Sequence, residues 1–202
     1  MTMVQDLLPT VTSADNVPGP AQGQWTAKDY PNLPDDGQAY EIMNGVLMKL
    51  PSPDSLHQQT LHRLSSYVVP HTRTTRLGHT YSDPIYLELA PDVVVRPDLF
   101  IDMHADHKQH SRETEKQLIG TPELIIEVTS PGSARYDWRD KYDAYARAGV
   151  WEYWIVHPEA KAVEVLILEN GQFRSSGVFE GQAAIRSKVL RLFDLPIENF
   201  FI

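Results

Sequence analysis

Two carboxylates and one ammonium occur where the neighbouring residues predict a buried position. Asp98 lies in RPDLFI and Glu127 in ELIIEV, and both stretches have the composition of buried strands. Lys141 follows Glu127 by 14 residues, in DWRDKYDAYARAG, where a leucine would be easier to explain. Because an unpaired buried charge is costly, we expect Lys141 to have an anionic partner, for which Asp98 and Glu127 are the candidates.

A helical wheel of residues 137–148 places Lys141 towards the interior. At about 100° per residue, one face gathers Trp138, Tyr142, Tyr145 and Ala148, with Lys141 on its edge. The opposite face carries the other charges, Arg139, Asp140, Asp143 and Arg147. Lys141 is therefore expected to point towards the sheet, where Asp98 and Glu127 are the nearest anionic candidates in sequence.

These residue types suit phosphodiester hydrolysis. Two carboxylates on adjacent strands can bind a hard divalent cation, Mg²⁺ or Mn²⁺, which keeps several waters of its own. The cation polarises a phosphate and lowers the pKa of a bound water, and a nearby lysine can orient that water or neutralise developing charge. A purely structural ion-pair network would use the same three charges, so the residues alone leave both readings open.

The order of the short motifs resembles a known family. RPD, then ELIIEVTSP, then a downstream lysine resembles the PD-(D/E)xK phosphodiesterase pattern, with the lysine moved onto the following helix. YEIMNGVLMKLPSP, RPDLFI, PELIIEVTSP and GVWEYWIVHP are together similar to the Uma2 (DUF820) family of restriction-endonuclease-like proteins. The similarity runs from Trp25 to Leu168 and extends weakly to the C-terminus.

The resemblance implies a role for each candidate residue. Asp98, Glu127 and the backbone carbonyl of Val128 would be metal ligands, and Lys141 would be the catalytic lysine that assists the attacking water. Glu41 would complete the acidic cluster. His57, on the first long helix, would be a supporting or phosphate-side group. Position 129 is Thr where the general nuclease motif has Lys, so the implied site requires Lys141 to reach it.

The hydrophobic pattern predicts strands and helices in one chain. Apolar periodicity predicts helices over 54–69 and 137–148, the second ended by Gly149, and Asn44-Gly45 and Asn170-Gly171 predict hairpins. Further strands are expected over 81–90, 92–101, 122–130 and 151–158, a loop with a short helix over 103–121, and a strand followed by a helical turn over 185–201. The expected fold class is α/β, or α+β: a restriction-endonuclease-like mixed β-sheet flanked by helices.

Length and composition limit the function classes. Residues 1–24 are rich in Pro, Gly, Ser, Thr and Gln, a composition that predicts a flexible N-terminal arm. The length of 202 residues predicts a single domain over 25–202. It has no cysteine, no apolar run of the roughly 20 residues that a membrane helix needs, and no signal-peptide pattern, so we expect a cytoplasmic protein. The net charge of −9 argues against a non-specific DNA coat protein, and less strongly against a nuclease.

Three functions are weighed. The first is a Mg²⁺- or Mn²⁺-dependent phosphodiesterase, an endonuclease acting on nucleic acid, with DNA the expected substrate; whether it works as a homodimer is left open. The second is a catalytically silent nucleic-acid-binding or regulatory module on the same fold. The third is a structural protein in which Asp98, Glu127 and Lys141 form only an ion-pair network. A His-rich loop, with His104, His107 and His110 three residues apart, is a weaker candidate metal site.

Overall fold

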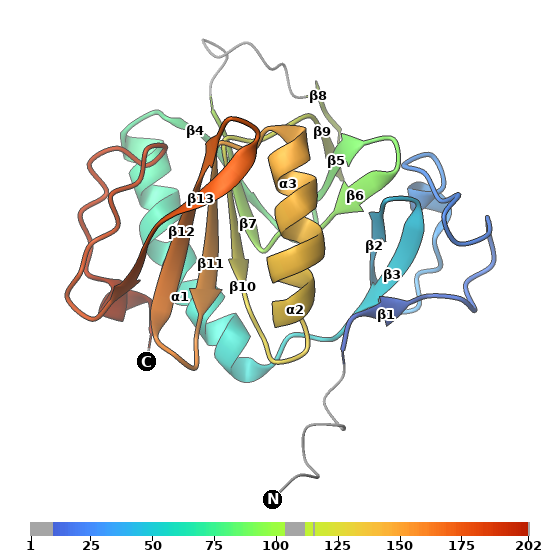
Figure 1. Cartoon of the computed structure of the whole chain (residues 1–202), viewed down its shortest axis with the longest axis horizontal. Coiled ribbons are helices and arrows are strands. Elements are labelled where there is room, and N and C mark those ends of the chain that lie inside the picture. The colour runs from blue at the N-terminus through green and yellow to red at the C-terminus, as the bar shows by residue number, and fades with distance from the viewer. Residues whose placement is uncertain (1–9, 104–111, 115, 202) are drawn as a thin grey trace, which may run out of the picture.

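The strands of the computed structural model form two mixed sheets (Figure 1). The structure describes residues 10–103, 112–114 and 116–201. The larger helices flank a six-stranded sheet of order β13-β12-β11-β10-β7-β4, in which β10 and β11 are parallel and the other pairs antiparallel. Its strands are β4 (Gly78–Ser82), β7 (Leu99–Met103), β10 (Leu124–Val128), β11 (Glu152–His157), β12 (Ala162–Glu169) and β13 (Gln172–Glu180).

The second sheet has the strand order β1-β3-β2-β6-β5-β9-β8 within the described residues. In this sheet β5 and β9 are parallel and the other pairs are antiparallel. Its strands are β1 (Thr12–Ser13), β2 (Ala39–Met43), β3 (Val46–Leu50), β5 (Tyr86–Ala90), β6 (Val93–Val95), β8 (Arg112–Glu113) and β9 (Gln117–Ile119).

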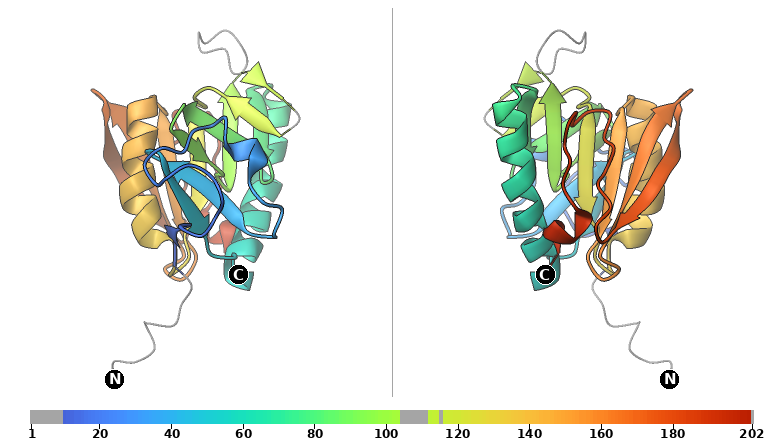
Figure 2. Two further views of the ribbon diagram at one scale, coloured as in Figure 1. Left: turned by 90° about the vertical axis from the view of Figure 1, so that its right-hand side faces the viewer. Right: turned by 90° about the vertical axis from the view of Figure 1, so that its left-hand side faces the viewer.

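Helices cover both faces of the six-stranded sheet. Figure 2 shows α1 (Ser55–Thr74) on one side of it and α3 (Tyr142–Ala148) on the other. A single turn, α2 (Ala134–Tyr136), and a π-helical stretch, η3 (Asp137–Lys141), lead directly into α3. Gly149 ends α3 with φ 90°, a left-handed conformation that glycine adopts without steric cost. Two short 3-10 turns, η2 (Tyr30–Asn32) and η4 (Ile197–Phe200), complete the elements.

The alternation of side chains along β10 decides what each residue faces. Leu124, Ile126 and Val128 belong to the core that α1 and the C-terminal segment cover. Ile125 belongs to the core on the α3 side, with Tyr145 of that helix. Since successive strand residues point to opposite faces, Glu127 shares the α3 side with Ile125.

Most of the predicted elements are confirmed. The hairpins turn at Asn44-Gly45 and Asn170-Gly171, and all four of these residues have positive φ, as a primed two-residue turn requires. The helix predicted over 54–69 is present and continues through Pro70 to Thr74. The buried strands predicted around Glu127 and over 151–158 are β10 and β11, and β11 lies between β10 and β12 inside the sheet.

The strands predicted over 81–90 and 92–101 are wrong in their continuity. Each is two strands that lie in different sheets, with breaks at Asp83-Pro84 and at Arg96-Pro97. Proline has no backbone N–H to donate to a sheet, so both breaks fall where pairing cannot continue. The chain therefore crosses between the sheets twice in the same region, and Asp98 lies at one of these crossings.

Three further predictions differ from the structure. The second half of the predicted arm is packed: β1 pairs with β3, and Gln22 accepts a hydrogen bond from the Leu47 N–H at 2.8 Å. Residues 185–201 form no strand, only an isolated bridge between Ala184 and Pro196 before η4. The described part of 103–121 contains β8 and β9 rather than a helix, and β9 pairs with β5. No helix in the described ranges has both the length and the hydropathy needed to cross a membrane.

Candidate active site

Glu127 is held from the α3 side of the sheet. Its Oε1 accepts hydrogen bonds from Lys141 Nζ at 2.8 Å and from the Tyr145 hydroxyl at 2.6 Å. The Glu127 side chain is 4 % exposed, so these two donors replace the water that a carboxylate would otherwise bind. Both hydrogen bonds reach Oε1, and Oε2 accepts no hydrogen bond from the described residues. Glu127 also lines a pocket.

Lys141 lies among three carboxylates. Its Nζ is 2.8 Å from Glu127 Oε1, 3.2 Å from Glu41 Oε1 and 3.6 Å from Asp137 Oδ1. All four side chains are at most 4 % exposed. A buried ammonium is stable only with such anionic partners, so the cluster explains why a lysine occupies this position. If all four groups are ionised, the cluster carries two more negative than positive charges.

Glu41 brings the second sheet into the cluster. It lies on β2, is fully buried, and its Oε1 accepts the Arg96 backbone N–H at 2.7 Å. Its Oε2 accepts the Tyr136 hydroxyl at 2.8 Å. One carboxylate therefore links β2, the RPD segment and the helix that carries Lys141. This fixes the position of Asp98, which is two residues beyond Arg96.

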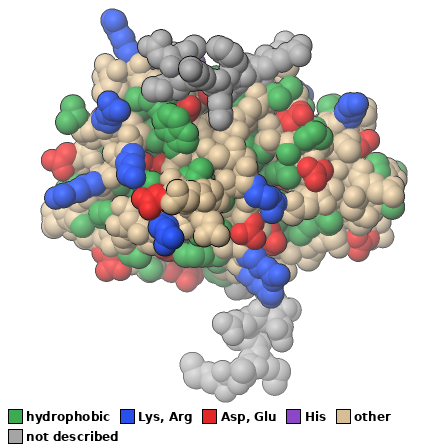
Figure 3. Space-filling view, turned by 45° about the horizontal axis from the view of Figure 1, so that its top comes forward, with side chains coloured by type: hydrophobic (Ala, Val, Ile, Leu, Met, Phe, Trp, Pro, Cys, Tyr) green, Lys and Arg blue, Asp and Glu red, His purple; other side chains and the backbone are tan. Residues whose placement is uncertain are grey.

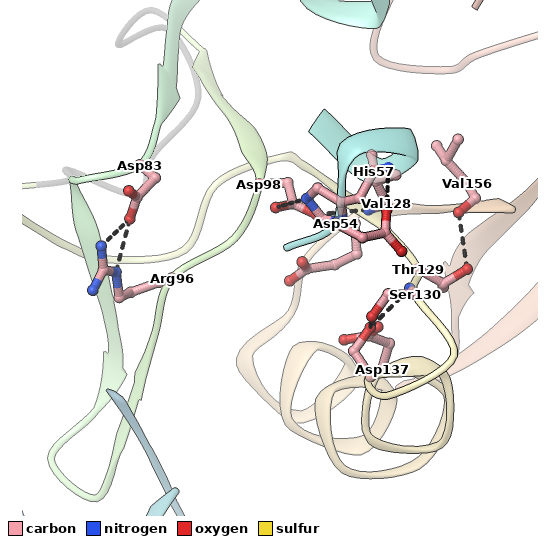
Figure 4. A network of polar contacts seen from close by, with 12 residues as sticks. Asp54, His57, Asp83, Arg96, Asp98, Val128, Thr129, Ser130, Asp137 and Val156 are labelled. Carbon is pink, nitrogen blue, oxygen red and sulfur yellow. Dashed lines mark hydrogen bonds and ion pairs between the residues drawn. The ribbon is translucent and has the colours of Figure 1, made fainter. Parts of the chain in front are cut away.

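Asp98 and His57 form a separate, more exposed pair. His57 Nε2 is 3.1 Å from Asp98 Oδ1, and the Val128 backbone N–H donates to Asp98 Oδ2 at 2.7 Å. Figure 4 shows the ring and the carboxylate turned towards each other beside the end of β10. The backbone N–H of His57 in turn donates to the side chain of Asp54, the N-cap of α1, at 2.8 Å. The helix start thus places the imidazole against Asp98.

The two groups share one pocket of about 200 Å³. Asp98, Glu127, Val128, Asp137 and Lys141 line one part of it. Apolar residues from β2, β3, the following segment and α1 also line it: Ala39, Leu50, Pro51, Pro53 and Leu61. A pocket with convergent polar groups and apolar walls is the usual form of a binding or catalytic site.

Burial sets the charge states in the cluster. It raises the pKa of Glu127 to about 8, an effect that Lys141 opposes and that Asp98, Asp137 and Glu41 reinforce. Burial likewise raises the pKa of Asp137 to about 6. Although burial of Lys141 disfavours its charge, the three carboxylates outweigh it and hold its pKa well above the usual value. Lys141 is therefore an ammonium, a donor rather than a base.

His57 also gains a proton more readily than a free imidazole. Burial opposes its protonation, but the hydrogen bond and charge of Asp98 outweigh burial and raise its pKa. A hydrogen bond with the Val128 backbone adds to the rise. When protonated, His57 donates to Asp98 Oδ1 and partly neutralises the carboxylate.

A family model described as "Putative restriction endonuclease", named Uma2, matches residues 27–198. The chain belongs to the Uma2 family. The fold also matches a crystal structure of "a putative nuclease belonging to DUF820" from Anabaena variabilis ATCC 29413, with a TM-score of 0.71 and 18% sequence identity. That match covers 87% of this chain and 97% of the other, and it confirms the expected fold class. No curated protein matches the sequence.

The structure brings together all of the residues selected from the sequence. Glu41, Glu127 and Lys141 form the buried cluster, and Asp98, His57 and Val128 form the adjoining pair and its backbone donor. Their roles in Uma2 chemistry stay predictions. His104, His107 and His110 lie outside the described residues.

One residue of the lysine helix was predicted wrongly and another was missed. Trp138, placed on the inner face, is 41% exposed, whereas Asp137 is 3% exposed and lines the pocket. The reason is the π-helical stretch Asp137–Lys141. A π-helix has more residues per turn than an α-helix, so its side chains point in other directions than a regular α-helical wheel predicts. Asp137 was missed as a site residue, although its spacing of four from Lys141 was a usable signal.

The donor set of the site fits a hard divalent cation. Glu127 and Asp98 supply carboxylate oxygens on the pocket wall, and the surplus of negative charge in the cluster would be reduced by a cation. No three His, Cys, Asp or Glu residues of the described chain form a ready-made metal site. Two carboxylates suffice for Mg²⁺, which commonly retains water for its remaining positions.

Proposed function

We propose that this Uma2 protein is a divalent-metal-dependent endonuclease that hydrolyses phosphodiester bonds in DNA. The observation that carries the proposal is the Lys141 ammonium, held by Glu41, Glu127 and Asp137 at the wall of a pocket that also contains Asp98. A purely structural ion pair needs neither a third carboxylate nor a pocket. Membership of a family described as "Putative restriction endonuclease" supports the same reaction class.

In this proposal Asp98, Glu127 and the Val128 carbonyl hold Mg²⁺ or Mn²⁺. Once bound, the cation would neutralise phosphate oxygens and lower the pKa of a water. Lys141, with its raised pKa, donates a hydrogen bond to the attacking water or to a phosphate oxygen and offsets charge as the P–O bond to the leaving oxygen breaks. Glu41, Asp137 and Tyr145 keep the lysine and Glu127 in position.

His57 is the proposed group on the phosphate side. It contacts Asp98, lines the same pocket and has a raised pKa. A protonated His57 can donate to a phosphate oxygen when Asp98 turns to another partner. Leu50, Pro51 and Leu61 give the same pocket an apolar wall.

The experiment is nicking of supercoiled plasmid with Mg²⁺ or Mn²⁺ at one salt concentration. The wild type is compared with Asp98→Asn, Glu127→Gln and Lys141→Met, and with Glu169→Gln, an exposed carboxylate on β12, as a matched control. We expect metal-dependent nicking by the wild type and the control, and at least a 100-fold loss in the three site variants, each shown to be folded by its thermal transition. Equal residual nicking in all samples would point to a contaminating nuclease and refute the proposal.

A catalytically silent nucleic-acid-binding module is the second candidate. The net charge of −9 favours it, as does the face in Figure 3, where Lys and Arg side chains are interspersed with Asp and Glu. A silent module would bind an oligonucleotide without nicking plasmid at any metal concentration. Plasmid nicking by the wild type separates the two functions, because only the endonuclease would nick and lose that activity in the site variants.

A further inference from the structure

Arg96 is a cationic side chain of the pocket that the proposed chemistry does not use. It lines the pocket together with Asp83, Asp98 and Lys141. Lys141 is buried and already surrounded by three carboxylates, whereas the Arg96 side chain is 22% exposed. Of the lining residues, Arg96 is therefore the permanent cation that an incoming anion can reach.

The backbone of Arg96 is fixed to the catalytic cluster. Its N–H donates to Glu41 Oε1 at 2.7 Å, and the same Glu41 oxygen lies 3.2 Å from Lys141 Nζ. Pro97 is buried and precedes Asp98 directly. Arg96 therefore lines the pocket from a backbone position set by the cluster, close in the chain to a proposed metal ligand.

The Arg96 guanidinium is paired with an exposed carboxylate, that of Asp83. Arg96 Nε donates to Asp83 Oδ1 at 2.8 Å, and Nη2 donates to the same oxygen (Figure 4). The Asp83 side chain is 58% exposed, on the segment that joins β4 to β5. The Tyr30 hydroxyl, which donates to the Tyr40 carbonyl, is a second neighbour of Arg96. An exposed ion pair of this kind is weak, so another anion can displace the carboxylate.

A phosphate is an anion that fits the two donors of the Arg96 guanidinium, Nε and Nη2, which together form its fork. Arginine binds phosphate oxygens through two parallel N–H groups, and Asp83 Oδ1 occupies the position that a phosphate oxygen would take. Contacts to backbone phosphates place a nucleic acid without reading its sequence. The neighbouring wall carries the carboxylates of Asp98 and Glu127, which would otherwise repel a polyanion.

We propose that Arg96 anchors a backbone phosphate of the nucleic-acid substrate, and that Asp83 holds Arg96 in the free protein and is displaced on binding. This inference rests on the proposed nuclease function, because it assigns the substrate phosphate to that pocket. Arg96 is a substrate-binding residue and Asp83 a competitor for it. The two halves of one ion pair therefore have opposite effects on affinity.

Opposite effects of the Arg96 and Asp83 substitutions on affinity distinguish a displaceable ion pair from a purely structural one. Removing Arg96 deletes the phosphate contact and weakens binding. Removing the charge of Asp83 frees the Arg96 guanidinium, and the apparent affinity rises by a factor of one over the fraction of molecules in which Arg96 was free. In a structural pair both substitutions would disturb the same segment and change binding in the same direction.

The experiment measures binding of a fluorescein-labelled duplex oligonucleotide by anisotropy, with the full chain, in EDTA and again with Ca²⁺. The variants are Arg96→Gln, Arg96→Lys and Asp83→Asn. The matched controls are Arg174→Gln and Glu169→Gln, which remove the same charges from an exposed pair with an Arg174 Nε to Glu169 Oε2 distance of 3.8 Å, outside the pocket. Thermal transitions establish that each variant is folded.

We expect Arg96→Gln to weaken binding about tenfold, and to lower the salt dependence by about one phosphate contact. Arg96→Lys should be intermediate because it keeps the charge without the fork. Asp83→Asn should tighten binding about threefold beyond Glu169→Gln, the effect of releasing a weak exposed pair. No binding by the wild type, or equal behaviour of pocket and control variants, or weaker binding by Asp83→Asn, would overturn the inference.

Plasmid nicking by the same proteins separates this inference from the proposed function. The expected affinity changes without nicking in the wild type would uphold the Arg96 anchor and refute the endonuclease. Nicking with unchanged affinities would refute the anchor and uphold the endonuclease. Nicking in which Arg96→Gln raises KM more than it lowers kcat would agree with both.

Discussion

Two buried glutamates on neighbouring strands of the six-stranded sheet are stabilised in different ways. Glu152, on β11, is fully buried, and its Oε1 accepts the Trp154 indole N–H at 2.6 Å. Its Oε2 accepts the backbone N–H groups of Lys188 at 2.7 Å and Val189 at 3.1 Å. Glu127, on β10, is instead bound by an ammonium and a phenol from one helix.

The two carboxylates also face opposite sides of the sheet. Glu152 points to the side where the C-terminal segment packs, and its donors in the described chain are neutral N–H groups. Two of them tie residues 188 and 189 to β11. Glu127 points to the α3 side and lines the pocket. A buried carboxylate is therefore not by itself a sign of function. Its partners and its access to a pocket decide whether it fastens the fold or serves a reaction.

The largest expected effect is on nicking activity. Glu127→Gln should reduce plasmid nicking at least 100-fold, because an amide is a poor metal ligand and cannot balance Lys141. Glu152→Gln, assayed where it is still folded, should retain activity within about threefold, because Glu152 has no contact with the pocket. Parallel loss in both variants would mean that the two glutamates do not differ in function.

The second effect is on the free energy of unfolding, measured by urea denaturation. Glu152→Gln should destabilise the protein by about 2–3 kcal/mol, because its two backbone donors would face an amide in place of a charge. At pH 5, Glu127→Gln should change stability by less than about 1 kcal/mol, because the raised pKa of Glu127, about 8, keeps it protonated there and glutamine resembles the protonated acid. A larger loss for Glu127→Gln than for Glu152→Gln would reverse the assignment.

The third effect is on the pH dependence of stability without metal. The folded pKa of Glu127, about 8, lies above its usual value of 4.5, and that of Asp137, about 6, lies above 3.8. The native state then binds more protons than the unfolded state in these windows, so stability falls as pH rises from about 4 to 8, by at most about 1.4 kcal/mol per pH unit for each group. Glu127→Gln should flatten the upper part of this fall, between pH 6 and 8, while Glu152→Gln should not. Melting temperatures in EDTA across this range provide the measurement.

The fourth expected effect is thermal stabilisation by the cation. At pH 8 we expect Mn²⁺ at 100 times its Kd to raise the stability of the wild type and Glu152→Gln by about 2.7 kcal/mol, and that of Glu127→Gln by much less. The midpoint of the shift gives the Kd of the site. An equal shift in all three proteins would place the bound cation elsewhere on the molecule.

Local patterns were enough to find the main charged residues of the site. Glu127 stood out because it interrupts an apolar strand, and Lys141 because it follows the helix period beside aromatic residues. The hairpins at Asn44-Gly45 and Asn170-Gly171 were equally predictable, since their turn chemistry involves neighbouring residues. Glu152 interrupts an apolar strand as clearly as Glu127 does, but the sequence alone gave no reason to separate the two.

By itself the sequence determined that Glu127 and Lys141 are buried; the tertiary structure decided which partners they have. Glu41 reaches Lys141 from the other sheet, and Glu152 meets the N–H groups of residues 188 and 189, contacts between segments far apart in the chain. The π-helical turn that aligns Asp137 with Lys141, and the crossings that bring Asp83 to Arg96, also depend on packing. The physical reason is that residue periodicity records burial, which is local, whereas pairing requires two distant segments to meet at hydrogen-bonding distance.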